Sequence, residues 1–226
     1  MPLRAAALAL LGFVGLPALA GCLVPESAVV PPGASVPESA AVRALADSLA
    51  AAPSPAARRA VAVRALRRAG VTPLAGGLFT VGVRAPLVGG FVPGRLPGRA
   101  SELVVVGASL DRPAAADVLE VARVLVDLSL VQTRPERTVQ VALWSGEDRE
   151  GLEAAVRAPL WPREAVVAAV VVGDGAVPDS LGGVPVVRVP ARGPALTSRL
   201  LRAVLDQADA PVSFPPAPPR DPGLDL

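Results

Sequence analysis

The chain has 226 residues, of which 52% are hydrophobic and 19% charged, so it can bury the core of one domain with appendages. Its formal net charge of +2 gives no basis for a nucleic-acid-binding protein. The sequence contains no histidine, which excludes an imidazole as general base, triad member or metal ligand anywhere in the chain.

Residues 1–21 have the pattern of a secretion signal. A short basic start is followed by an apolar run over residues 5–19, which is too short to span a bilayer comfortably. The run ends in Leu19-Ala20-Gly21-Cys22, which resembles the lipobox of bacterial lipoproteins. The resemblance implies that Cys22 is lipidated and becomes the mature N-terminus. An ordinary cleaved signal peptide or a short membrane anchor is the alternative.

Lipidation of Cys22 would place the protein in the bacterial cell envelope. Several acyl chains, palmitate among them, hold a protein on a membrane stably, where a single chain does not. Leu23 follows the cysteine in place of the Asp associated with inner-membrane retention, which favours the outer membrane. Because Cys22 is the only cysteine, no intramolecular disulfide can form. Residues 22–38, rich in Pro and Ser, predict an extended tether.

The remaining chain predicts one domain over residues 39–210 and an irregular proline-rich tail over residues 211–226. Apolar residues at helical spacing predict helices over residues 39–51, 56–69, 114–130, 151–157 and 194–208. Valine-rich or alternating runs predict strands over residues 77–84, 87–92, 103–107, 139–144, 165–172 and 184–189. Unbroken apolar runs such as residues 103–107 are typical of buried parallel strands. The order of elements predicts an α/β fold, a three-layer sandwich with a mostly parallel central sheet.

Carboxylates follow three of the predicted strands. Asp111 comes after residues 103–107, the pair Glu147-Asp148 after residues 139–144, and Asp174 after residues 165–172. Right-handed crossovers would bring these side chains to one edge of the sheet, where α/β proteins collect functional groups. Adjacent carboxylates repel each other, so such a pair is often tied to a metal or to a base role. A solvated acidic turn is the alternative.

Other chemistries are excluded or weakly indicated. The segment from Gly107 to Asp111 lies near the nucleophile-elbow pattern around Ser109, but the last glycine is missing and no histidine can activate the serine. A Walker-type phosphate loop is impossible without lysine. Five arginines give residues 56–69 a basic face that could touch anionic lipid headgroups, with an ordinary solvated surface as the favoured alternative: Arg58, Arg59, Arg64, Arg67 and Arg68.

Six segments, in the right order, are similar to the two-zinc aminopeptidase family (peptidase family M-28). They are LRRAGV, LVGGFVPGR, ELVVVGASLD, DVLEVARVL, TVQVALWSGEDREGL and LWPREAVVAAVVVGDG. The resemblance covers residues 56–210 and implies a truncated zinc-aminopeptidase-like fold.

The resemblance also implies site residues. Glu147 falls where the family has its general base, and Asp148 falls on a metal-ligating Glu. Asp174 matches a later metal-ligating Asp, and Asp111 the aspartate that orients the first ligating His. That His is Ser109 here. The loop with the bridging Asp is deleted, because Arg112-Pro113 leads straight into the next helix, and the late ligating His is absent.

A hydrolytic zinc site needs about three protein ligands. The lost ligands therefore predict a non-catalytic binding or assembly protein, whose peptide or protein partner the sequence does not identify. No cofactor is expected, with zinc possible only if the ancestral site is partly retained. The alternative is a residual metal-dependent aminopeptidase that uses Glu147, Asp148 and Asp174 with a borrowed ligand. A third possibility is an α/β lipoprotein with no peptidase ancestry.

Overall fold

The computed structural model describes residues 40–74, 76–82, 86–130, 135–156, 165–173 and 177–209. All of them belong to the compact unit Ser35–Leu226. Four predicted features lie outside the described residues and remain predictions: the lipidation site Cys22, the tether, Asp174 and the proline-rich tail.

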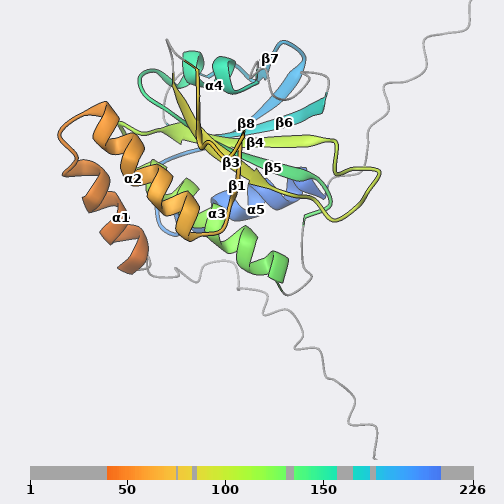
Figure 1. The fold of residues 1–226 in the computed structure, drawn as a ribbon. Helices are drawn as coiled ribbons and strands as arrows, with labels where there is room; N and C mark the ends of the chain where they lie inside the picture. The colour runs from red at the N-terminus through yellow and green to blue at the C-terminus, as the bar shows by residue number, and fades with distance from the viewer. Residues whose placement is uncertain are drawn as a thin grey trace, which may run out of the picture. The chain divides into compact units, whose positions relative to one another are not determined.

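A central sheet has the strand order β1-β3-β5-β4-β6-β8-β7, with β2 pairing with β3 (Figure 1). Strands β5, β4, β6 and β8 are parallel neighbours, while β1, β2, β3 and β7 join antiparallel at the two sides. This arrangement confirms the predicted α/β class with a mostly parallel sheet. The strands are β1 (Thr72–Pro73), β2 (Thr80–Val81), β3 (Leu87–Val92), β4 (Leu103–Ser109), β5 (Thr138–Trp144), β6 (Val166–Val172), β7 (Ser180–Leu181) and β8 (Val184–Val189).

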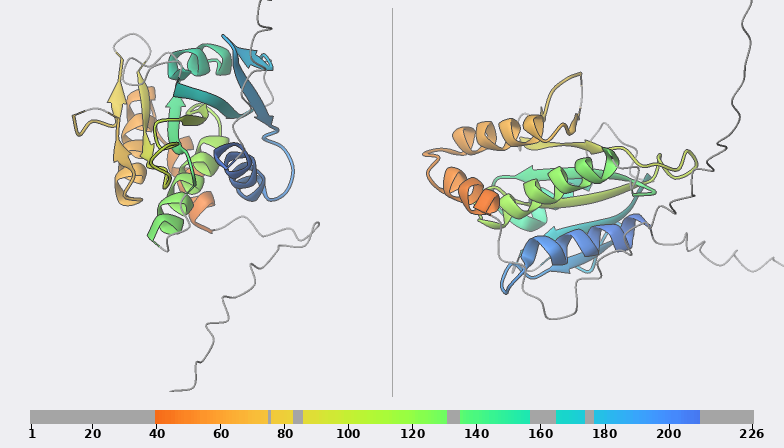
Figure 2. Two further views of the ribbon diagram at one scale, coloured as in Figure 1. Left: turned by 90° about the vertical axis from the view of Figure 1, so that its right-hand side faces the viewer. Right: turned by 90° about the horizontal axis from the view of Figure 1, so that it is seen from below.

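Helices cover both faces of the sheet and make three layers (Figures 1 and 2). One face is covered by α2 (Pro55–Arg68), α3 (Ala114–Leu130) and α5 (Leu196–Ala208), and α1 (Ala40–Ala50) packs against α2 and α3. The other face packs against α4 (Asp148–Val156). Alternate residues of β4 lie in the hydrophobic cores on the two faces of the sheet. Val104 and Val106 lie in the core beneath α2, α3 and α5, and Leu103 and Val105 lie in the core beneath α4.

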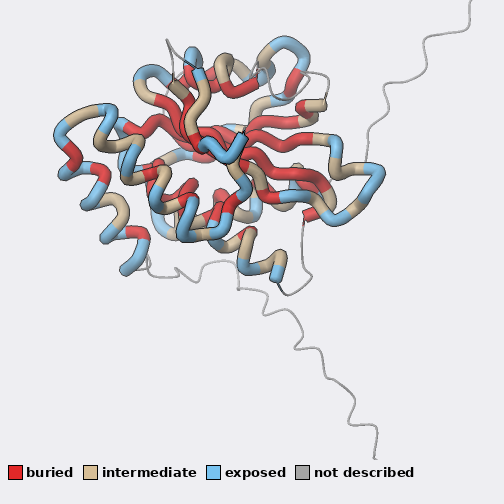
Figure 3. The backbone as a smooth tube through the Cα atoms, viewed as in Figure 1, coloured by how far each residue is buried: buried red, intermediate tan, exposed pale blue. Residues whose placement is uncertain are grey.

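The two middle strands are buried along their whole length. Every residue of β4 and of β5 is buried, and Figure 3 shows the buried backbone concentrated in the centre of the sheet. Strands buried on both faces are mostly apolar, as the valine-rich run of β4 is, although β5 also buries Thr138 and Gln140. No helix among the described residues is both long and apolar enough to cross a membrane.

Two predicted elements differ from the structure. Helix α4 begins at Asp148 and not at Gly151, so Asp148 is helical and does not belong to a turn. Acidic residues in a first helical turn are stabilised by the helix dipole, and Asp148 and Glu150 provide that signal. Of the strand predicted over residues 77–84, only Thr80–Val81 forms a strand among the described residues, as β2 against β3, and Leu78 forms an isolated bridge.

Candidate functional site at the carboxyl edge of the sheet

The loops that follow β4 and β5 are bonded to each other. Ser109 and Trp144 are register partners, so the two parallel strands end at the same level. The backbone N–H of Leu110 donates to the carbonyl of Trp144 at 2.6 Å. The Gly146 N–H donates to Oδ2 of Asp111 at 2.8 Å. Asp111 and the acidic pair after β5 therefore do meet at one edge, as the strand order predicted.

Asp111 also reaches the helical layer. Its Oδ1 lies 2.9 Å from Nη2 of Arg58 in α2, and both side chains are partly exposed. An ion pair with this exposure contributes little to stability. Its effect is geometric, because it occupies the second oxygen of Asp111 and ties α2 to the end of β4.

Asp148 is the most unusual group at this edge. Its side chain is 3% exposed, and neither carboxylate oxygen has a hydrogen-bond partner. The cation paired with it is Arg112, whose Nη1 lies 3.7 Å from Oδ2 and whose own side chain is 42% exposed. Buried carboxylates normally accept several hydrogen bonds. Here the helix dipole and one guanidinium offset the charge, with no directional bond.

The end of β6 lies against the same carboxylate. A Cβ atom at Gly173 would stand 2.7 Å from Oδ2 of Asp148, which is closer than such atoms approach. A side chain at this position would displace the carboxylate, so Gly173 leaves the space that Asp148 occupies. Asp148 therefore lies next to two segments. One is the loop after β4, which carries Arg112, and the other is the end of β6, which is followed by Gly173.

The remaining predicted site residues are placed differently. Ser109 is fully buried, and its Oγ accepts a 3.3 Å hydrogen bond from the backbone N–H of Asp111. Glu147 is exposed, and its backbone carbonyl accepts the N–H of Gly151 at 3.1 Å in the first turn of α4. The roles assigned to these residues by resemblance remain predictions.

Trp144 fills the space beneath this edge. Its indole lies where side chains at Gly107 of β4 and Gly151 of α4 would be, with Cβ positions 2.4 and 2.0 Å from the ring. Trp144 is 3% exposed and belongs to the core on the α4 side of the sheet. Its Nε1 and the hydroxyl of Ser145 are buried without hydrogen-bond partners. The site therefore has a tightly packed aromatic floor with unsatisfied polar atoms.

The described residues do not fit a zinc centre. No three His, Cys, Asp or Glu side chains within the described ranges come together in a group that could hold a metal ion. Zinc sites are built mainly from His and Cys, with about three protein ligands in a catalytic site. Asp148 instead faces a guanidinium, whose positive charge opposes cation binding at the same carboxylate.

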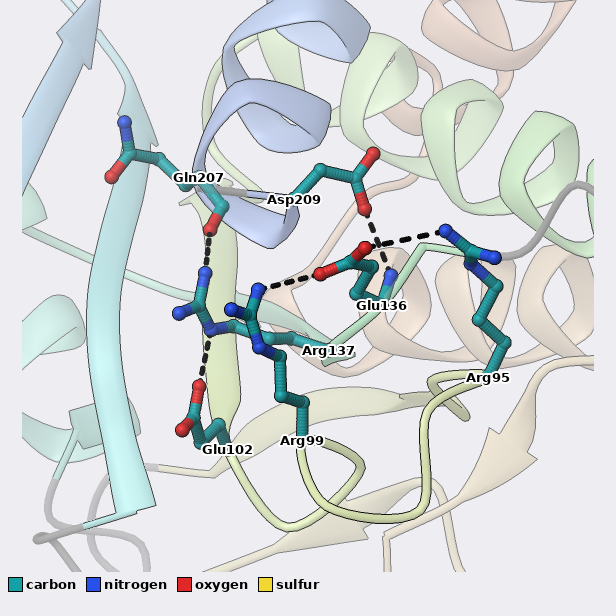
Figure 4. Close-up of polar contacts among 7 residues, drawn as sticks. All are labelled: Arg95, Arg99, Glu102, Glu136, Arg137, Gln207 and Asp209. Atoms are coloured by element: carbon teal, nitrogen blue, oxygen red, sulfur yellow. Dashed lines mark hydrogen bonds and ion pairs between the residues drawn. The ribbon is translucent and has the colours of Figure 1, made fainter. Parts of the chain in front are cut away.

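A second polar cluster, which sequence reasoning missed, lies at the opposite edge of the sheet (Figure 4). Arg137, 4% exposed at the start of β5, pairs with Glu102 before β4 and donates to the carbonyl of Gln207 in α5 at 2.8 Å. The N–H of Glu136 donates to Asp209, at the end of α5, at 2.9 Å. These partners are 35 to 73 positions apart in sequence, so no local pattern reveals them. The cluster anchors the end of α5 to the strands.

No protein-family model and no curated protein matches the sequence. Solved structures of similar arrangement include a glutaminyl cyclase from Porphyromonas gingivalis, with 15% identity over 58% of this chain and 58% of that chain and a TM-score of 0.37. LapB from Legionella pneumophila has 13% identity, coverage of 72% and 57%, and a TM-score of 0.36. An amidase of the hydantoinase/carbamoylase family from Burkholderia multivorans has 16% identity, coverage of 74% and 39%, and a TM-score of 0.32.

The chain thus spans between 39% and 58% of the length of these three structures. At such identities and TM-scores they carry no residue assignment. The fold class rests on the strand order and the helical layers described above.

Proposed function

We propose that the chain is a lipid-anchored envelope protein whose zinc-aminopeptidase-like domain has lost catalysis and serves binding or assembly. One observation carries the proposal. The carboxylate that falls on a metal-ligating position of that family, Asp148, is paired with the guanidinium of Arg112.

A guanidinium can replace a metal ion as the compensating charge of a buried carboxylate. Arg112 stands where the resemblance places a deleted loop, the one that carries the bridging metal ligand in the family. With that loop absent, Arg112 approaches Asp148, while Asp111 is held by Arg58 and the Gly146 N–H. Asp111 and Asp148 are thus each paired with an arginine, and the positive charge beside each carboxylate lowers its affinity for a cation.

The hydrophobic core around the site is complete on both faces of the sheet. A well-packed domain without a catalytic site supports a binding role over loss of all function. Buried apolar side chains fill both faces of the sheet. The lipobox-like Cys22 would hold this domain at the envelope, with the outer membrane favoured, where it can meet a peptide or protein partner.

The test is made on the purified chain, with metal analysis and aminopeptidase assays with and without added zinc. The proposal expects no stoichiometric zinc and no turnover above that of a chain with Glu147→Gln. Tight zinc together with turnover that Glu147→Gln abolishes would overturn it.

A residual metal-dependent peptidase is the second candidate, because both oxygens of Asp148 keep free acceptor positions. That function requires Glu147 as base, Asp148 and Asp174 as ligands, and a ligand from a partner chain. It predicts peptidase activity that appears only in the presence of the partner and disappears with Asp148→Asn.

A further inference from the structure

Charge is unevenly distributed over the described residues. Residues 40–69, which form α1, α2 and their connections, contain six arginines and one acidic residue, Asp47, for a net charge of +5. The other described residues contain ten arginines and thirteen acidic residues, for a net charge of −3. The small net charge of the whole chain therefore conceals a strongly basic region.

Helix α2 concentrates this charge on its outward face. Ala62 and Leu66 are fully buried against the rest of the domain, and Arg64, Arg67 and Arg68 are exposed on the other side of the helix. The structure gives Arg64 and Arg68 no ion pair with any described carboxylate. Arg67 lies over the ring of Phe79, with its Cζ 6.0 Å from the ring centroid.

These three arginines repel one another. Positions three and four apart on a helix are neighbours, and like charges there destabilise the helix. Arg67 and Arg68 gain some compensation from the C-terminal end of the helix dipole, while Arg64 lies a turn earlier. An anionic surface would convert this repulsion into attraction at all three positions.

An exposed leucine lies one residue from the aromatic ring that Arg67 covers. Leu78 is 62% exposed and directly precedes Phe79, the ring beneath Arg67. Within the described ranges, only Leu130 is a comparably exposed large apolar side chain. Arginines beside an exposed apolar side chain match the interfacial zone of a bilayer, where headgroups meet acyl chains.

We propose that the surface formed by Arg64, Arg67, Arg68 and Leu78 docks the domain onto an anionic phospholipid bilayer. The inference rests on the proposed membrane location, but the contact itself does not need an acyl group on Cys22. Seventeen residues separate Cys22 from Ala40. A chain of that length reaches about 60 Å at most, so a domain tethered at Cys22 stays close enough to the membrane for this face to bind.

The test compares vesicles of phosphatidylcholine with vesicles that also contain phosphatidylglycerol, using the full chain with Cys22→Ser. The ratio of the two partition coefficients removes any contribution of the apolar N-terminal segment, which enters both membranes. Neutralising Arg64, Arg67 and Arg68 together to Gln is expected to lower this ratio about 100-fold, since each arginine near an anionic surface favours binding by about fivefold. High salt is expected to lower the ratio of the parent chain in the same direction.

The matched control neutralises three exposed arginines on other elements, Arg149, Arg192 and Arg202, with the same change in net charge. It is expected to keep most of the parent ratio. Equal losses in the two variants, or no preference of the parent for anionic vesicles, would overturn the proposal. Circular dichroism melting of both variants shows that they are folded.

A second measurement locates the contact. Because the chain has one cysteine, Cys22→Ser with Leu78→Cys leaves a single thiol for an environment-sensitive fluorophore. Docking predicts a blue shift on anionic vesicles that the Arg64, Arg67 and Arg68 variant loses, and an unchanged emission would contradict it. Failure of lipidation would appear as a missing acyl mass on the wild-type chain, so the two proposals fail separately.

Discussion

Asp148 and Arg112 form an ion pair of 3.7 Å in which the carboxylate is buried and the guanidinium is partly exposed. Neither carboxylate oxygen accepts a hydrogen bond, so the loss of hydration of the buried Asp148 carboxylate is only partly offset by Arg112. This relationship separates the two proposed functions, because one uses Asp148 as a structural ion and the other as a metal ligand.

Asp148→Asn is expected to stabilise the fold by about 1–2 kcal/mol, because it removes a buried charge that has no hydrogen bonds to lose. Arg112→Gln is expected to destabilise it by about 1 kcal/mol, since the buried carboxylate loses its cation, although solvent screens the exposed guanidinium. Urea unfolding measures both. Glu147→Gln, at the exposed neighbour, is the control and should change stability by less than about 0.5 kcal/mol. Destabilisation by Asp148→Asn would mean that Asp148 has a structural bond.

Gly151→Ala tests the packing of Trp144 against α4. Alanine favours helices over glycine by about 1 kcal/mol, so an unobstructed site would gain stability. The added Cβ would stand 2.0 Å from the indole, and the overpacking is expected to cost about 1–3 kcal/mol instead. Thermal or urea unfolding decides the sign. In a double-mutant cycle, Trp144→Leu should recover part of the loss, and full additivity of the two changes would contradict the close contact.

Arg137→Met tests the cluster at the amino edge of the sheet. The change keeps an apolar stem but leaves Glu102 without its ion pair and the Gln207 carbonyl without its donor. Because Glu102 is 25% exposed, the expected loss is about 2–3 kcal/mol, below the value for a fully buried pair. Arg202→Met on the exposed side of α5 is the matched control. Equal, small effects of the two changes would show that the cluster does not anchor α5.

Cys22→Ser tests the lipid anchor. In a bacterial host, the wild-type chain should incorporate labelled palmitate and fractionate with membranes, and the variant should incorporate none. No other cysteine can substitute, since the sequence contains only this one. Labelling of the variant, or none of the parent, would remove the lipoprotein part of the proposal.

The sequence was informative where burial dictates composition. The valine-rich runs predicted β4, β5 and β6, and helical spacing predicted α3 with the bounds that the structure has. The predicted start of α4 at Gly151 is wrong, because an acidic pair after a strand fits a turn as well as a first helical turn, and Asp148 is the first residue of the helix. Strands β1 and β7 have two residues each, which is too short for a periodic pattern.

The candidate site could be predicted only as a location. Strand order brings Asp111, Glu147 and Asp148 to one edge, and the sequence singled out all three. The pairing of Asp148 with Arg112 could not be predicted, because it depends on how the loop after β4 crosses the start of α4. The same holds for Asp111 and Arg58, which lie on different layers of the fold.

Metal binding by the full chain tests the central claim most directly. Zinc, magnesium and calcium are each titrated against the wild-type chain and Asp148→Asn, with the melting temperature and the metal retained after dialysis as readouts. The account predicts no retained metal and no stabilisation of either chain, because arginines already compensate the carboxylates at this edge. Stoichiometric zinc that raises the melting temperature of the wild type and is lost in Asp148→Asn would contradict it.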